Sequence, residues 1–181
     1  IEDIVRKISL SHPAVQLQLT HQGKSLRQYA SAMSMAEREF RVRQALGAAF
    51  IEAAMYFEEQ KEGMTLSGWV ATPSYSRSQA DQQYFFVNGR SIRDKVLGHA
   101  VRQGYHDVLH HGRQPAYVIF FELDPRLVDV NVHPTKHEVR FRESRSVHNF
   151  IFSTVHHVLS RSLAKGGAAT PSQEESMPGA Q

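Results

Sequence analysis

The sequence YFFVNGRSIRDKVLGHAVRQ, residues 84–103, joins a short apolar run to an amphipathic one. Tyr84 to Asn88 has the length and aromatic content of a β-strand. Ser91 to His111 has a helical apolar period and is predicted to be one long helix. Ala116 to Leu123 is a continuous apolar run, as in a buried strand. This strand–helix–strand order, with further strands on either side, predicts an α/β domain in which a mixed β-sheet is packed with helices.

The predicted helix has an apolar side and a basic side. The apolar side consists of Val96, Leu97, Ala100, Val101, Gly104, Tyr105 and Val108. Lys95, His99, Arg102 and His106 follow at i, i+4, i+7 and i+11 on the opposite side.

Arg90 and Arg93 are predicted at the entrance of this helix, where backbone N–H groups also favour an anion. Such a surface can contact phosphates, although a solvated basic face is the simpler explanation of the helix taken alone. Because no recognisable major-groove module or series of base-stacking aromatics accompanies it, DNA binding here would be directed to the backbone and indifferent to sequence.

A second informative stretch, DVNVHPTKHEVRF, covers residues 129–141. A strand is expected to end at His133, and Pro134 then forces an exposed turn. Lys136 is therefore predicted at a loop tip, where its long side chain is suited to reach a phosphate. A second strand is expected at Val139 and Phe141. Without further information, an ordinary surface lysine in a turn remains the alternative.

Residues outside these two stretches predict the remaining elements. The helix near residue 40 should bury Phe40, Ala45, Leu46 and Ala49. The last helix should bury an apolar stripe of Val147, Phe150, Ile151, Val155, Val158 and Leu159. The other expected elements are a helix over residues 1–10, a hairpin over 15–30, strands over 55–59 and 65–71, and a loop over 73–83; the two helices just described should span 36–49 and 144–163. We expect one domain over residues 1–164 and a disordered linker over 165–181.

Composition excludes several functional classes. The 181 residues include no cysteine, which rules out disulfides, thiol catalysis and cysteine-bound zinc. Eleven histidines lack a convincing ligand spacing, so no metal site is predicted. No apolar run has the roughly 20 residues of a membrane helix, and no membrane association is expected. The formal charge of +3 permits a polyanionic partner without requiring one. We interpret Ile1 as an internal position of a longer protein.

The chain resembles the MutL-type DNA mismatch repair family in three segments. These are residues 84–103, residues 124–144 with the unusual sequence NVHPTKHEVRF, and the shorter segment WVATP over 69–73. The resemblance implies the second domain of the family's N-terminal ATPase region, with a fold like ribosomal protein S5 domain 2. It implies that Lys136 reaches the ATP γ-phosphate held by the preceding domain, and that Asn88 and Gly89 shape a turn. It also implies a DNA-contacting groove formed by Arg90, Arg93, Lys95 and Arg102.

The same resemblance implies a division of labour within the full-length protein. The fragment itself should hold no cofactor and hydrolyse no ATP, whereas the whole protein should use ATP and Mg²⁺. DNA and mismatch-repair proteins, such as the mismatch recogniser, are the implied partners. The fragment is expected to be a monomer, the full-length protein a homodimer, and the location the bacterial cytoplasm. Three alternatives remain: a transducer domain of a gyrase-like topoisomerase, a pure protein-interaction module, and a stand-alone RNA-binding protein of the S5 type.

Overall fold

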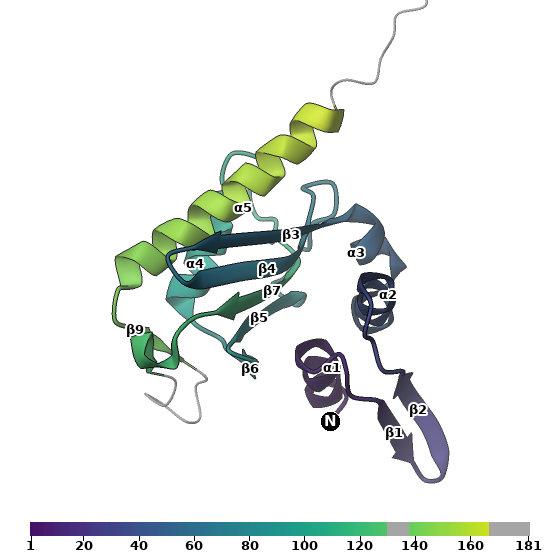
Figure 1. The fold of residues 1–181 in the computed structure, drawn as a ribbon. Helices are drawn as coiled ribbons and strands as arrows, with labels where there is room; N and C mark the ends of the chain where they lie inside the picture. The colour runs from purple at the N-terminus through teal and green to yellow at the C-terminus, as the bar shows by residue number, and fades with distance from the viewer. Residues whose placement is uncertain (130–137, 167–181) are drawn as a thin grey trace, which may run out of the picture.

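The centre of the molecule is a five-stranded sheet with the order β3-β4-β7-β5-β6. The computed structural model describes residues 1–129 and 138–166, and Figure 1 shows the sheet between two groups of helices. The strands of this sheet are β3 (Ala54–Lys61), β4 (Met64–Ala71), β5 (Gln83–Val87), β6 (Arg90–Ser91) and β7 (Tyr117–Glu122).

The sheet is mixed, as predicted. β5 pairs with β7 in parallel, whereas β3–β4, β4–β7 and β5–β6 are antiparallel pairs. A parallel pair requires a crossover connection, and α4 (Lys95–Gly104) lies in the segment that joins β5 to β7. β7 lies between two neighbours at the middle of the sheet, which accounts for its continuous apolar sequence.

Helices cover both faces of the sheet (Figure 1). One face packs against α4 and α5 (Ser144–Gly166), and their shared core includes Leu66, Phe85 and Ile119. The other face packs against α2 (Met35–Leu46) and α3 (Ala48–Ala53). α4 and α5 approach closely at Gly104, where an added Cβ would lie 2.7 Å from Cγ1 of Val155. This glycine is therefore explained by helix packing.

The N-terminal segment forms a smaller unit, consisting of α1 (Glu2–Ser11) and a separate two-stranded sheet, β1 (Leu17–His21) and β2 (Lys24–Tyr29). Arg41 of α2 connects its parts. Its side chain is only 2% exposed, and its guanidinium donates hydrogen bonds to four backbone carbonyls. The acceptors are the carbonyl oxygens of Ser9, His12, Val15 and Ala30. Burial lowers the pKa of Arg41 from its ordinary value, and the carbonyl dipoles take the place of water around the cation.

Two sequence-based expectations about helices were wrong. The helix predicted over 91–111 is only α4, and the chain before it forms β6 and an irregular entrance. In the helix near residue 40, Ala45 and Leu46 are buried as predicted, but Phe40 is 57% exposed and Ala49 is not part of the core. The positive φ of 101° at Gly47 divides the predicted helix into α2 and α3, so Ala49 lies on a different helix from Ala45 and Leu46. Within α2, Arg41 is buried in place of its neighbour Phe40.

The last helix agrees with its predicted apolar stripe, since all six expected side chains are buried. α5 continues to Gly166, slightly beyond the predicted end of the domain. Residues 167–181 lie outside the described part of the chain, so the domain boundary and the linker stay predictions.

We expect Arg41→Met to lower the free energy of unfolding by roughly 3 kcal/mol or more, because it leaves several buried carbonyls without donors. Arg43→Met is the matched control, since Arg43 is exposed on the same helix, and should change stability by less than about 0.5 kcal/mol. Urea denaturation followed by circular dichroism measures both. Equal, small effects for the two variants would contradict the conclusion that Arg41 holds the N-terminal unit together.

Candidate functional site

A tight turn connects β5 to β6 and sets the start of the candidate site. Asn88 and Gly89 have φ values of 47° and 80°, the left-handed conformation of a two-residue hairpin turn. The Asn88 side chain makes two 3.0 Å hydrogen bonds with Leu123: its Nδ2 donates to the carbonyl, and its Oδ1 accepts from the backbone N–H. The turn is thereby tied to the end of β7, which agrees with the shaping role expected for Asn88 and Gly89.

The four cations predicted to contact DNA lie along β6, its connection to α4 and α4 itself, and all four are exposed. Arg90 begins β6, Arg93 lies in the entrance before α4, and Lys95 begins the helix. Arg102 lies near the helix end and donates a 2.8 Å hydrogen bond from Nη2 to Oε1 of Gln114. The structure thus places them on a strand, a connection and a helix that follow one another along the chain.

The entrance of α4 differs from the expectation of an open anion site. Asp94 is the N-cap residue, and its Oδ1 accepts hydrogen bonds from the backbone N–H groups of Val96 (2.8 Å) and Leu97 (3.2 Å). The protein's own carboxylate therefore occupies the donors that an external anion would use. His106 also lies beyond the end of α4, so only Lys95, His99 and Arg102 share the helix.

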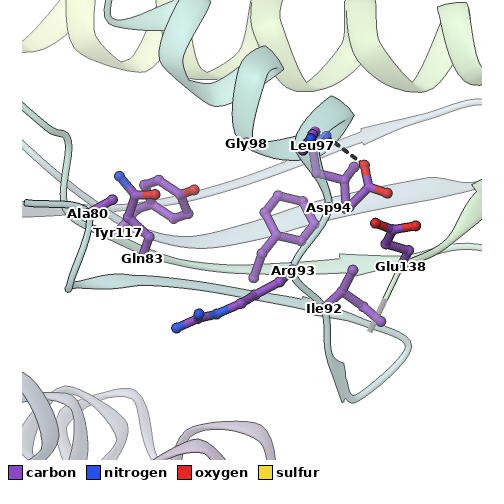
Figure 2. A pocket seen from close by; sticks show the side chains of 11 residues that line it. Ala80, Gln83, Ile92, Arg93, Asp94, Leu97, Gly98, Tyr117 and Glu138 are labelled. Atoms are coloured by element: carbon purple, nitrogen blue, oxygen red, sulfur yellow. Dashed lines mark hydrogen bonds between the residues drawn. The ribbon is translucent and has the colours of Figure 1, made fainter. Parts of the chain in front are cut away.

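A cleft of about 390 Å³ lies beside this entrance (Figure 2). Its apolar lining includes Phe85, Ile92 and Leu97, and its polar lining includes Arg93 and Glu138. Figure 2 shows the Asp94 and Glu138 carboxylates at one end of the cleft, and Gln83, Tyr117 and Ala80 at the other. Because Glu138 belongs to the second informative stretch, the cleft unites the two segments that the sequence singled out.

Lys136 itself lies outside the described residues. The described residues that flank its segment form a short antiparallel ladder, β8 (Val128–Asp129) with β9 (Arg140–Phe141). Val139 and Phe141 are both buried, but only Phe141 belongs to the second strand, which begins at Arg140. The γ-phosphate role of Lys136 stays a prediction.

Sequence reasoning missed the polar residues inside the cleft. Tyr117 is part of an apolar strand, and its side chain is only 3% exposed. Burial raises the pKa of its hydroxyl above the ordinary value for tyrosine. Gln83 precedes the predicted strand and had no recognisable signal. Its Nε2 donates a 3.1 Å hydrogen bond to the carbonyl of Pro115, just before β7. Only the pairing of β5 with β7 reveals that these residues are neighbours.

The described residues offer neither a metal site nor a membrane-spanning helix. Residues 1–129 and 138–166 contain no group of three or more acidic or histidine side chains able to hold a metal ion. Within those same ranges, no helix combines the length and the apolar character needed to cross a bilayer.

Comparison with known proteins identifies the family. A family model described as "DNA mismatch repair protein, C-terminal domain" matches residues 42–160. MutL of Cellvibrio japonicus is 53% identical over 161 residues, which is 89% of this chain and 26% of that protein. MutL of Pseudomonas aeruginosa strain LESB58 is 46% identical over 180 residues, 99% of this chain and 27% of that protein. The chain belongs to the MutL family of DNA mismatch repair proteins.

A solved structure supports the fold. The crystal structure of the N-terminal domain of a DNA repair protein superposes with a TM-score of 0.69 at 19% identity, over 89% of this chain and 53% of that one. The mixed sheet and its helices are consistent with the fold of ribosomal protein S5 domain 2. Because the chain belongs to the MutL family, the topoisomerase and RNA-binding alternatives are set aside. The chain spans about a quarter of the length of its MutL relatives.

We expect Asp94→Ala to lower the free energy of unfolding by about 1 kcal/mol, because two N–H groups of α4 lose their cap. Asp107→Ala removes an exposed carboxylate beyond the end of the helix and should change it by less than about 0.5 kcal/mol. Urea denaturation of both variants tests this. If Asp94→Ala were as stable as the control, the cap would contribute nothing.

Proposed function

We propose that this chain provides MutL with a DNA-contacting surface and with the residue that responds to bound ATP. The observation that supports DNA contact is the succession of Arg90, Arg93, Lys95 and Arg102 along β6, the entrance of α4 and α4 itself. Most of these side chains come from regular elements, which favours a fixed surface over a mobile charged loop. Phosphate contacts from such a surface give affinity without reading the sequence.

Helix geometry aligns part of this surface. Lys95 and Arg102 are seven positions apart on α4, which places them on the same side of the helix, roughly 10 Å apart along its axis. The hydrogen bond to Gln114 fixes the orientation of Arg102. It uses one of the five guanidinium N–H donors, so the others remain able to contact phosphate.

The ATP response is assigned to Lys136. The resemblance to MutL-type proteins suggests that its ammonium group meets the γ-phosphate of ATP held by another part of the protein. A cation at this position would stabilise the charge that develops during hydrolysis. The isolated chain is expected to be inactive, since the ATP and Mg²⁺ would be held elsewhere in MutL.

Exposed apolar side chains on the surface of the N-terminal unit support contact with other parts of MutL. Ile4 and Ile8 of α1 are 60% and 40% exposed, and Leu26 of the hairpin is 42% exposed. A two-stranded sheet is marginally stable alone, so further chain packed on this surface would stabilise it. We propose that the rest of MutL covers it. The bacterial cytoplasm as location, homodimerisation of the whole protein, and association with the mismatch recogniser belong to the same proposal.

For the DNA surface, we expect the double variant Lys95→Glu/Arg102→Glu to weaken binding of a short duplex by at least about tenfold at low salt. The slope of log K against log salt should become shallower by about 0.9 for each phosphate that is no longer neutralised. Fluorescence anisotropy of a labelled duplex, measured from low to physiological salt, reports both quantities. The control is Arg43→Glu/Arg161→Glu, which makes the same charge change at exposed positions elsewhere. An equal weakening in both double variants would show a net-charge effect and contradict the proposed surface.

For the ATP response, we expect Lys136→Ala in the full-length protein to lower steady-state ATP turnover by about 100-fold, the scale of removing one group that stabilises the transition state. Lys61→Ala, at the exposed end of β3, is the control and should leave turnover unchanged. Circular dichroism of both variants establishes that the fold persists. Unchanged turnover in Lys136→Ala would favour the protein-interaction alternative for this chain.

A further inference from the structure

The cleft beside α4 has a glycine in its wall that packing does not explain. Gly98 lies within α4 and lines the cleft (Figure 2). An added Cβ at Gly98 would meet no heavy atom within 4 Å, in contrast to Gly104, where Val155 is in the way. Glycine is among the least favourable residues for a helix interior. Its use at Gly98 leaves the wall open at a point where any larger side chain would narrow the cleft.

The end of the cleft that is lined by Tyr117 and Gln83, which we call its inner end, offers unused polar groups. The Tyr117 hydroxyl makes no hydrogen bond to any residue in the described ranges, although the residue is only 3% exposed. Tyr117 lines the cleft, and its hydroxyl is not among the fully buried side-chain atoms without partners in those ranges, which are nitrogens of Arg6, Arg41 and Trp69. The bond from Gln83 Nε2 to Pro115 leaves the Gln83 amide oxygen as a second group able to accept from a ligand.

The rim of the cleft carries both signs of charge. Arg93 and Lys95 are cations, and Asp94 and Glu138 are carboxylates gathered at one end (Figure 2). A phosphate inside the cleft would lose water against an apolar lining and lie near two carboxylates, which disfavours a nucleotide or a DNA strand as its occupant. An apolar side chain would instead bury its surface against Phe85 and Leu97. Flanking charges of opposite sign could then pair with the two sides of the rim.

We propose that this cleft binds a segment of a partner protein, in which an apolar anchor side chain enters the cleft and an acidic residue close beside it pairs with Arg93 and Lys95. Its volume of about 390 Å³ suits one large side chain with adjacent backbone, near the lower end of ligand sites in proteins. A backbone C=O of the segment would accept a hydrogen bond from the Tyr117 hydroxyl, and a backbone N–H would donate one to the Gln83 amide oxygen. The proposal goes beyond DNA contact, since its apolar and inner polar parts have no role in holding a phosphate backbone.

Selection from a phage-displayed library of random 12-residue peptides against the whole chain is the first test. The peptides that are enriched should share an apolar residue with Asp or Glu within about two positions. One of them, made synthetically with a fluorescent label, is then the probe for anisotropy titrations. No enrichment, or enriched peptides without this shared pattern, would overturn the proposal.

Gly98→Leu is the decisive variant, because the new side chain enters the cleft without its Cβ meeting core atoms. It should weaken peptide binding by at least about tenfold. Gly98 lies between Lys95 and Arg102 on the same side of α4, so duplex affinity should fall as well, but by clearly less than peptide affinity because the four cations are unchanged. Gln103→Leu places the same side chain on the same helix but about 140° around its axis, and should bind the peptide normally. A thermal melt confirms that both variants fold. Peptide binding unaffected by Gly98→Leu would overturn the site.

Tyr117→Phe tests the inner end. Removal of one hydrogen bond should weaken peptide binding by roughly fivefold, with duplex binding unchanged. The two proposals can fail separately. Peptide binding that is weakened clearly more than DNA binding in Gly98→Leu is a result about the cleft alone. Absence of duplex binding in the unaltered chain would contradict only the DNA surface. If Gly98→Leu weakened duplex and peptide equally, the cleft would be part of a nucleic-acid site and the peptide proposal would be wrong.

Discussion

The parallel pairing of β5 with β7 is the constraint on which the candidate site depends. Parallel strands end at the same edge of a sheet, so the turn after Val87 and the chain after Glu122 leave the sheet together. Asn88 secures this arrangement through its two hydrogen bonds with Leu123. One segment that resembles MutL passes through the first of these points, and another begins just after the second. Their closeness in space therefore follows from strand direction, before any contact between their own side chains is considered.

Strand direction also explains how much of this region could be predicted. Apolar runs identified β5 and β7, and the requirement for a crossover made a helix between them expected. The C-terminal end of that helix could not be predicted from the sequence, because its apolar period continues past Gly104 to Tyr105 and Val108. These two side chains pack against the core although they belong to a turn. At the N-terminal end, the helix begins after Asp94 because the residues before it form β6 and an irregular connection, which the apolar period does not indicate. Periodicity records which side chains are buried, and a turn can bury them as well as a helix can.

Arg41 shows a different limit of sequence reading. Helical spacing predicts a solvent position for a charged residue such as Arg41 and a core position for Phe40 beside it, yet their burial is reversed. The reversal depends on carbonyls supplied by the end of α1, by its connection to β1 and by the segment after β2. None of these acceptors is visible in the sequence, because every backbone has carbonyls and only the fold determines which ones converge. Lys136 lies at a comparable limit, since its proposed partner is held outside this chain.

The DNA surface and the cleft share Arg93 and Lys95, which makes the two proposed partners interdependent. An acidic residue bound at these cations would remove them from phosphate contact, whereas Arg90 and Arg102 would stay available. DNA binding would then weaken without being abolished, and by thermodynamic linkage DNA would weaken binding of the segment by the same factor. Salt would reduce this coupling, because exposed charges are screened within about 10 Å at roughly 0.1 M. Burial of the apolar anchor is not screened in this way, so rising salt would favour the segment over DNA. The same domain could thus pass from a DNA-bound to a partner-bound state with no change in its fold.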